Sequence, residues 1–284
     1  MKQILITGMN SYVGNSLTDW LSNHPQNYNI TRISMRSDEW KEQDFGSYDC
    51  IVHVAGLAHV STDKDLEDKY YKVNYKLTEE VAEKAKTSGV GQFVFLSSII
   101  VYGNAQQIIN ENTEEIPLDF YGDSKLKAEK SLKELASNDF KVSIIRSPMV
   151  FGENSKGNYQ KLSKYIMFMP LFPKFKNKRS MIYIYNLCEF IRLLIDDRAQ
   201  GTFYPQNDQH TSTTNLVKLM AKSQNRRVIC VRIFNPLIRK LIPKINIMNK
   251  LFGNLAYDLE ISRYKHKYNL YSLEEAVERT EKNR

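Results

Sequence analysis

Apolar residues in the first half of the chain come in short β-prone runs that alternate with longer stretches of helical period. Strands are expected at residues 2–7, 29–34, 50–54, 92–97 and 142–146, and helices at residues 13–23, 65–88 and 120–137. Regular alternation of strands with helices favours a parallel, doubly wound sheet with helices on both faces. The predicted fold class is therefore α/β.

After Gly152 the pattern loosens and prolines recur, which indicates a smaller lobe laid over the C-terminal edge of the sheet. Residues 181–196 are again strongly apolar and are expected to return to the sheet. The predicted organisation is a sheet domain of residues 1–150 and 181–196, interleaved with a smaller lobe of residues 151–180 and 197–284.

The first predicted strand leads into a turn that suits a phosphate. An apolar run ends at Gly8, and a helical pattern follows through Leu17 and Leu21. This order places backbone N–H groups at a helix N-terminus, where a pyrophosphate binds well. Ser11 stands where the pattern expects a glycine, so an ordinary strand–helix turn stays open as an alternative. The residues expected at the phosphate are Gly8, Asn10, Ser11, Tyr12, Val13 and Gly14.

A second motif lies about a hundred residues later. Tyr121 and Lys125 are four apart in a predicted helix and therefore share one face. A nearby ammonium favours a phenolate, so the pKa of Tyr121 is expected to fall from about 10 towards working pH. Tyr121 then serves as a proton donor or acceptor, and Ser98 as a hydroxyl that holds a substrate carbonyl. Ser97 is the competing hydroxyl.

These motifs, in this order, resemble the extended short-chain dehydrogenase/reductase family, and within it the nucleotide-sugar branch. The likeness also covers residues 49–59, 71–78, 93–103, 146–152 and 178–187 and extends into the tail. It implies a Rossmann fold in which the sheet domain binds a nicotinamide dinucleotide and the smaller lobe binds substrate. The family usually has a further strand and helix where this chain has only residues 38–48, so a reduced sheet is expected on the adenine side.

The resemblance also assigns roles near the cofactor. It puts Tyr121 and Ser98 at the reacting oxygen, and it gives Lys125 the nicotinamide ribose as a second partner. Ala55 belongs to the turn that lies against the cofactor, and Pro148 to the segment that backs the nicotinamide.

On the substrate side, the resemblance assigns Arg179 to a diphosphate, because a planar guanidinium can hold two oxygens at once. It assigns Asn158 to the nucleotide. His59 and Met149 are expected near the sugar, although His59 equally suits a loop histidine without a role.

The choice of cofactor depends on the end of the second strand. An acidic residue there pairs with the ribose 2′-hydroxyl of NAD, whereas an arginine suits the 2′-phosphate of NADP. The run from Ile33 continues through Arg36 to Asp38. Arg36 favours NADP(H), and Asp38 keeps NAD(H) open if the strand ends later.

The predicted reaction is NADPH-dependent reduction of a UDP-4-keto-6-deoxy-N-acetylhexosamine at C4, in capsule or O-antigen sugar synthesis. Arg36 supports it, as do Ala58 and Met149, which replace a lysine and an asparagine of a resembling 4-epimerase. An NAD-dependent UDP-sugar 4-epimerase is the alternative. A dinucleotide-sensing regulator would need a broken pair of Tyr121 and Lys125, which here is intact.

Composition and charge bear on location and partners. The chain of 284 residues has no apolar stretch long enough to span a bilayer, and its three cysteines sit in apolar contexts. A cytoplasmic enzyme is expected, without a metal site because the five histidines show no ligand spacing. No nucleic-acid motif accompanies the net charge of +8, so nucleic acid is not an expected partner.

Two surfaces are candidates for larger partners. Residues 226–250 mix lysine and arginine with apolar residues. They predict either an amphipathic cap with a solvated face or a surface that attracts an anionic membrane or a partner in polymer synthesis. A homodimer is expected through the predicted helices at 65–88 and 120–137.

Overall fold

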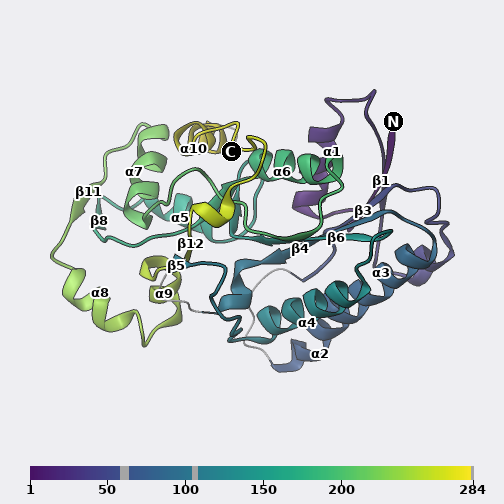
Figure 1. The fold of residues 1–284 in the computed structure, drawn as a ribbon. Helices are drawn as coiled ribbons and strands as arrows, with labels where there is room; N and C mark the ends of the chain where they lie inside the picture. Colours follow the sequence, from purple (N-terminus) through teal and green to yellow (C-terminus); the bar gives the residue numbers. More distant parts are fainter. Residues whose placement is uncertain (58–63, 104–107, 283–284) are drawn as a thin grey trace.

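A parallel sheet forms the centre of the computed structural model, which describes residues 1–57, 64–103 and 108–282 (Figure 1). Within these residues the sheet has six strands, in the order β10-β6-β4-β3-β1-β2. The strands are β1 (Lys2–Thr7), β2 (Tyr28–Ile33), β3 (Cys50–His53), β4 (Gln92–Ser98), β6 (Lys141–Ser147) and β10 (Gly201–Phe203). The five predicted strands are confirmed, and β10 is an additional strand that the pattern did not predict.

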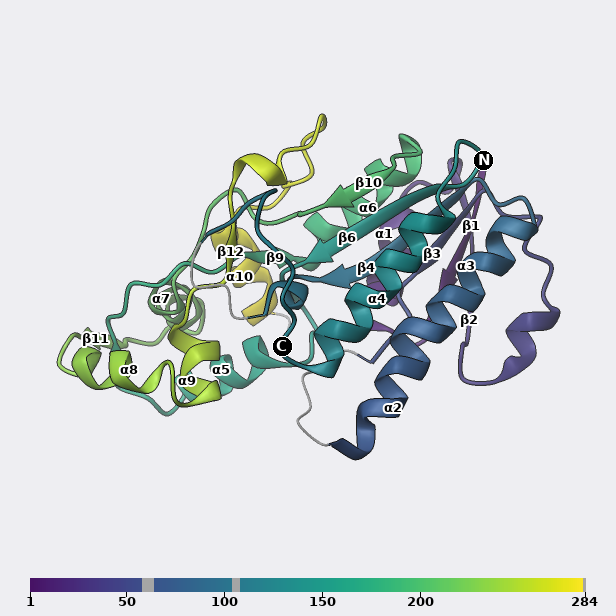
Figure 2. The ribbon, with the colours of Figure 1, turned by 60° about the horizontal axis from the view of Figure 1, so that its bottom comes forward.

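Helices cover both faces of the sheet, as Figure 2 shows. One face carries α1 (Tyr12–Leu21) and α6 (Ile184–Asp196), and the other carries α3 (Leu77–Thr87) and α4 (Phe120–Leu135). The pleat directs successive side chains of β1 to opposite faces, so Ile4 and Ile6 join one hydrophobic core and Leu5 the other. The predicted α/β class is confirmed.

The sheet is shortened on the side of β2, as expected. Residues Asp38–Glu42 form a short 3-10 helix, and β2 remains the edge strand. Trp40 and Phe45 are buried and pack against Leu5 and Ile33 in one core. A few apolar side chains therefore close this end of the molecule in place of a further strand and helix.

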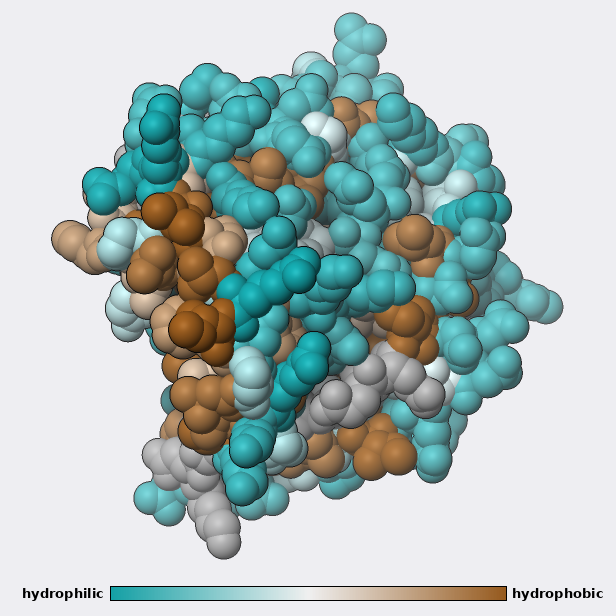
Figure 3. Space-filling view, turned by 90° about the vertical axis from the view of Figure 1, so that its left-hand side faces the viewer, coloured by the Kyte–Doolittle hydropathy of each residue, from teal (hydrophilic) through white to brown (hydrophobic). Residues whose placement is uncertain are grey.

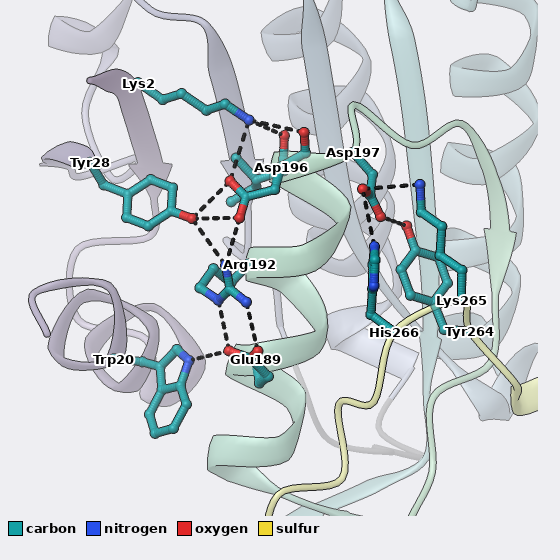
Figure 4. Close-up of polar contacts among 11 residues, drawn as sticks. Lys2, Trp20, Tyr28, Glu189, Arg192, Asp196, Asp197, Tyr264, Lys265 and His266 are labelled. Atoms are coloured by element: carbon teal, nitrogen blue, oxygen red, sulfur yellow. Dashed lines mark hydrogen bonds and ion pairs between the residues drawn. The ribbon is translucent and has the colours of Figure 1, made fainter. Parts of the chain in front are cut away.

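Polar contacts tie α6 to the sheet domain, as Figure 4 shows. Arg192 bridges Glu189 at 2.7 Å and Asp196 at 2.6 Å along one side of the helix. The Tyr28 hydroxyl donates to Asp196 at 2.8 Å, and Trp20 Nε1 donates to Glu189 at 3.0 Å. Residues 184–196 are thereby held against α1 and β2, although they are far from both in sequence.

Smaller elements form the rest of the molecule. They are α2 (Glu67–Tyr70), a π-helical turn (Tyr71–Lys76), β5 (Ile108–Ile109), β7 (Met149–Phe151), α5 (Asn158–Ile166), β8 (Leu171–Pro173), β9 (Met181–Tyr183), α7 (Thr213–Ser223), β11 (Ile229–Val231), α8 (Asn235–Leu241), α9 (Asn246–Phe252), β12 (Ala256–Tyr257) and α10 (Leu273–Lys282). Parallel pairs β7–β9, β8–β11 and β5–β12 connect them. Among the described residues, no helix is long and apolar enough to cross a membrane.

Candidate active site

The turn after β1 is built for close approach of a ligand. Gly8 has a φ of +91°, and a Cβ there would lie 3.0 Å from the backbone nitrogen of Ala55. Ser11 has an ordinary φ of −75° and caps α1, its hydroxyl accepting from Gly14 N at 2.9 Å. The missing glycine at Ser11 therefore leaves the turn intact, because this position needs a capping side chain and no positive φ.

A cavity of about 880 Å³ opens beside this turn. Its walls include Gly8, Asn10, Ser11, Arg36 and Ala55, all predicted for the cofactor. The size, the tight glycine and the helix N-terminus fit the adenosine diphosphate part of a nicotinamide dinucleotide.

Six residues predicted for the cofactor lie outside the lining of this cavity: Tyr12, Val13, Gly14, Tyr121, Lys125 and Pro148. The Val13 side chain belongs to the hydrophobic core. The Tyr12 ring packs against that core, and its hydroxyl would lie 2.7 Å from a Cβ at Gly152. Pro148 is buried between β6 and β7. Any contact of these residues with a cofactor would come through the backbone or at the nicotinamide end.

Several cations line this cavity. Arg36, Lys41, Lys69, Lys72 and Lys76 all line it. β2 ends at Ile33, so the first positions past the strand are Ser34 and Met35, and neither is acidic. Asp38, in the short 3-10 helix, also lines the cavity, and Lys41 Nζ is 3.2 Å from its carboxylate.

The tyrosine and the serine meet where β4 and α4 come together. β4 ends at Ser98, and α4 begins at Phe120 with Asp119 as its N-cap, which accepts from Gly122 N at 2.8 Å. The Ser98 side chain lies close enough to Tyr121 to act on the pKa of its hydroxyl. Ser97 is buried and bonds Glu129 instead. The geometry therefore brings Ser98, and not Ser97, to Tyr121.

The pKa prediction for Tyr121 is wrong in this arrangement. Burial raises the pKa of Tyr121 to about 12, although Ser98 opposes the rise. Lys125 Nζ donates to Leu96 O at 2.9 Å and lies 4.6 Å from the centre of the Phe95 ring. The ammonium is thus turned towards β4, and burial lowers the pKa of Lys125 to about 8, against the opposing effect of Glu129.

Asn74 is a site residue to which sequence reasoning gave no role. It is fully buried in the π-helical turn. Its side chain accepts from Leu57 N at 2.7 Å and donates to Leu57 O at 3.2 Å and to Ser124 Oγ at 3.2 Å. Asn74 thereby joins the Ala55–Leu57 turn to α4. The available signal in the sequence was an asparagine inside a helical pattern. The structure places it in a π-helical turn, and such turns often occur at functional sites.

Arg179 lies partly buried beside the end of α9. Its guanidinium donates to Gly253 O at 3.4 Å, and its backbone pairs with Thr211. No carboxylate of the described residues lies within ion-pair distance of it. Burial without a counter-charge lowers the pKa of Arg179 to about 10. Such a cation is suited to an anionic ligand.

The other substrate predictions are placed less decisively. Asn158 is exposed at the first position of α5, and Met149 is half-buried in β7. His59 and Ala58 lie outside the described residues.

A family model for the NAD dependent epimerase/dehydratase family matches residues 4–204. The chain belongs to this family. The match confirms the predicted resemblance, and with it an enzyme of the short-chain dehydrogenase type. The fold and the paired Ser98 and Tyr121 agree with that membership.

Two curated relatives match much of the chain. A UDP-glucose 4-epimerase of Vibrio cholerae is 30% identical, over 91% of this chain and 88% of the relative. An N-acetyl-alpha-D-glucosaminyl-diphospho-ditrans,octacis-undecaprenol 4-epimerase of Escherichia coli O157:H7 is 31% identical, over 73% of this chain and 65% of the relative.

Solved structures share the fold. A UDP-glucuronic acid 4-epimerase of Bacillus cereus in complex with NAD has a TM-score of 0.77 at 17% identity, over 99% of this chain and 98% of that one. A dTDP-4-dehydrorhamnose reductase of Bacillus anthracis in complex with NADP has a TM-score of 0.73 at 20% identity, over 98% of both chains. Structures of this fold thus hold either nicotinamide dinucleotide.

Proposed function

We propose that the protein is a 4-epimerase that inverts C4 of a hexose carried on a diphosphate. The observation that carries this proposal is the match over 91% of the chain to a UDP-glucose 4-epimerase, joined with the placement of Ser98 at the end of β4 and Tyr121 at the start of α4. The second relative is also named a 4-epimerase, and its sugar is also carried on a diphosphate. UDP-N-acetylhexosamines are the first substrates to test.

Each residue has a role in this reaction. Tyr121 takes the proton of the C4 hydroxyl as the hydride leaves, and it returns the proton to the inverted alcohol. Ser98 holds the C4 oxygen, and Arg179 holds the diphosphate. A bound nicotinamide dinucleotide would accept the hydride and give it back. Lys125 is placed to hold the nicotinamide ribose, and its charge then favours the Tyr121 phenolate.

The predicted 4-ketoreductase remains the second candidate, and one feature favours it. The cavity wall past β2 carries Arg36 and no acid at Ser34 or Met35, which suits the 2′-phosphate of NADP(H). Arg36→Ala tests this cofactor preference: NADPH affinity should fall much more than NADH affinity. Equal losses would leave the 2′-phosphate without a role for Arg36.

Tyr121→Phe tests the proposed chemistry. Turnover of the C4 epimers should fall by about two to four orders of magnitude, because only the acid–base group is removed. Cofactor affinity, measured by fluorescence titration, should stay near that of the parent protein. Tyr70→Phe is the matched control, since its ring lies 6.0 Å from that of Tyr121. Near-normal turnover of Tyr121→Phe would exclude the assignment.

A further inference from the structure

A large apolar surface lies around the end of α5, β11 and α8. Exposed side chains include Phe168 at 83% and Ile233 at 79%, with Leu237 and Ile247 also largely exposed. Figure 3 looks at this side of the molecule and shows hydrophobic residues gathered along one flank of it. Apolar surface of this extent needs a partner, since isolated exposed residues are common but gathered ones are not.

The surface comes from two segments that the fold joins. Residues 165–171 run from the end of α5 to the start of β8, and residues 229–247 include β11 and α8. In the β8–β11 pair Leu171 stands opposite Ile229, and both side chains are exposed. Ile229 N also donates to Pro170 O at 3.0 Å, and Asn235 Nδ2 to Lys174 O at 3.0 Å. The two segments therefore form one face, here called the apolar–basic face.

Positive charge is concentrated in two long sequence segments that include this face. Residues 154–188 and 209–257 hold 16 lysines and arginines and no aspartate or glutamate, so the remaining chain has 24 of the former against 32 of the latter and is net acidic. Arg226, Arg227, Arg232, Arg239 and Lys240 are exposed. None of them forms an ion pair with any residue in the described part of the chain. Exposed apolar side chains interspersed with such cations are complementary to an anionic bilayer.

The same face adjoins the predicted diphosphate site. Arg179 contacts the carbonyl of Gly253, the residue directly after α9, at 3.4 Å. Asn158 begins α5, and the exposed apolar residues Tyr165 and Phe168 lie at and just beyond its other end. A protein lying on a membrane through this face would hold Arg179 close to the lipid headgroups.

We propose that the apolar–basic face docks on an anionic membrane, and that the sugar diphosphate bound at Arg179 is carried by a membrane lipid. The docking stands on the surface alone, whereas the lipid-carried substrate rests on the proposed 4-epimerase function. Free UDP-sugar would then be a poorer substrate than the same sugar diphosphate presented in vesicles.

Vesicle flotation tests the docking. The full chain should float with vesicles of phosphatidylcholine and phosphatidylglycerol in equal amounts, and much less with phosphatidylcholine alone or at high salt. Ile233→Ser with Leu237→Ser should weaken binding by at least about tenfold, and so should Arg239→Glu with Lys240→Glu. Leu259→Ser with Leu270→Ser, and Arg263→Glu with Lys267→Glu, are matched controls on other exposed positions.

Three results would overturn the docking. The first is that the parent protein does not float with vesicles at low salt, and the second is that the control variants lose as much vesicle binding as the test variants. The third is that the parent protein binds no vesicles, while Ile233→Ser with Leu237→Ser abolishes a dimer. The last would make the face a protein interface. Epimerisation assays test the second part of the proposal, the lipid-carried substrate, separately from the docking. Vesicle binding without turnover of either substrate form would refute the proposed function and leave the docking. Turnover of UDP-sugar alone, unaffected by vesicles, would refute the lipid-carried substrate.

Discussion

Two arginines in this protein differ in whether a carboxylate compensates their charge. Arg146 is 1% exposed and lies in a closed network, with Glu129 at 2.6 Å and Glu115 at 2.7 Å. Arg179 is partly buried, and within the described residues its guanidinium hydrogen-bonds the Gly253 carbonyl at 3.4 Å and no carboxylate. Burial lowers the pKa of Arg179 to about 10, whereas the carboxylates beside Arg146 raise the pKa of that guanidinium.

The difference separates a structural charge from a ligand-binding one. In a buried ion pair with matched hydrogen bonds, the attraction offsets at least part of the desolvation cost. Removing one partner leaves the other as an unpaired buried charge. A shielded cation without a counter-ion destabilises the empty protein and is retained where an anion binds. Lys125 belongs with Arg179, since it bonds the Leu96 carbonyl and burial lowers its pKa. Arg179 and Lys125 are thus both buried or partly buried cations without an ion pair among the described residues, and both are predicted to contact ligands.

Arg146→Met should have the largest effect on stability. It leaves Glu129, which is fully buried, without its counter-ion, and breaking such a pair costs about 3–5 kcal/mol. Denaturant unfolding of the variant measures the loss. Arg263→Met is the matched control, because its ion pair with Glu260 is exposed and contributes at most about 1 kcal/mol. Similar losses of stability in both variants would show that the buried Arg146 network stabilises the protein no more than an exposed ion pair does.

Arg179→Met should have the opposite signature. The empty protein should be as stable as the parent or slightly more so, because an unpaired charge is removed. Inhibition by free UDP should weaken by about ten- to a hundredfold, since hydrogen bonds to charged groups contribute about 1.5–3 kcal/mol. The rise in Tm caused by UDP should shrink with it. A large loss of stability, or unchanged inhibition, would place Arg179 with Arg146.

Lys125→Met should be more stable than the parent at pH 7, by about 1–2 kcal/mol after allowing for the lost bond to Leu96 O. The folded pKa of about 8 lies below the ordinary 10.5, so the cost of the buried charge is fully present below pH 8. The cost falls as pH rises from about 8 to about 10.5, and the two proteins should converge there.

Unfolding at several pH values measures this convergence, and cofactor affinity should fall in the same variant. Lys127→Met, which removes an exposed lysine paired with Asp123, should show no such pH-dependent gap. If the difference in free energy of unfolding between Lys125→Met and the parent stays constant with pH, the Lys125 charge is compensated in the folded protein.

The contrast also shows what sequence could and could not predict. β1 to β4 and β6 follow from apolar runs between turns, and the positions of Tyr121 and Lys125 follow from helical spacing. The three-residue β10 was missed, because so short a strand has no measurable period. The direction in which Lys125 points, and the absence of a carboxylate near Arg179, depend on segments distant in sequence. Spacing alone therefore gave the wrong sign for the pKa of Tyr121.

The central claim is that hydride leaves C4 and returns to C4 of the same sugar. A UDP-N-acetylhexosamine deuterated at C4, incubated with the protein and only a trace of cofactor, tests it directly by NMR. The proposal predicts the opposite C4 epimer with deuterium retained at C4, and no net change in cofactor redox state. A protein that leaves this substrate untouched, yet consumes NADPH stoichiometrically with a 4-keto-6-deoxy sugar, would contradict the proposal in favour of the ketoreductase.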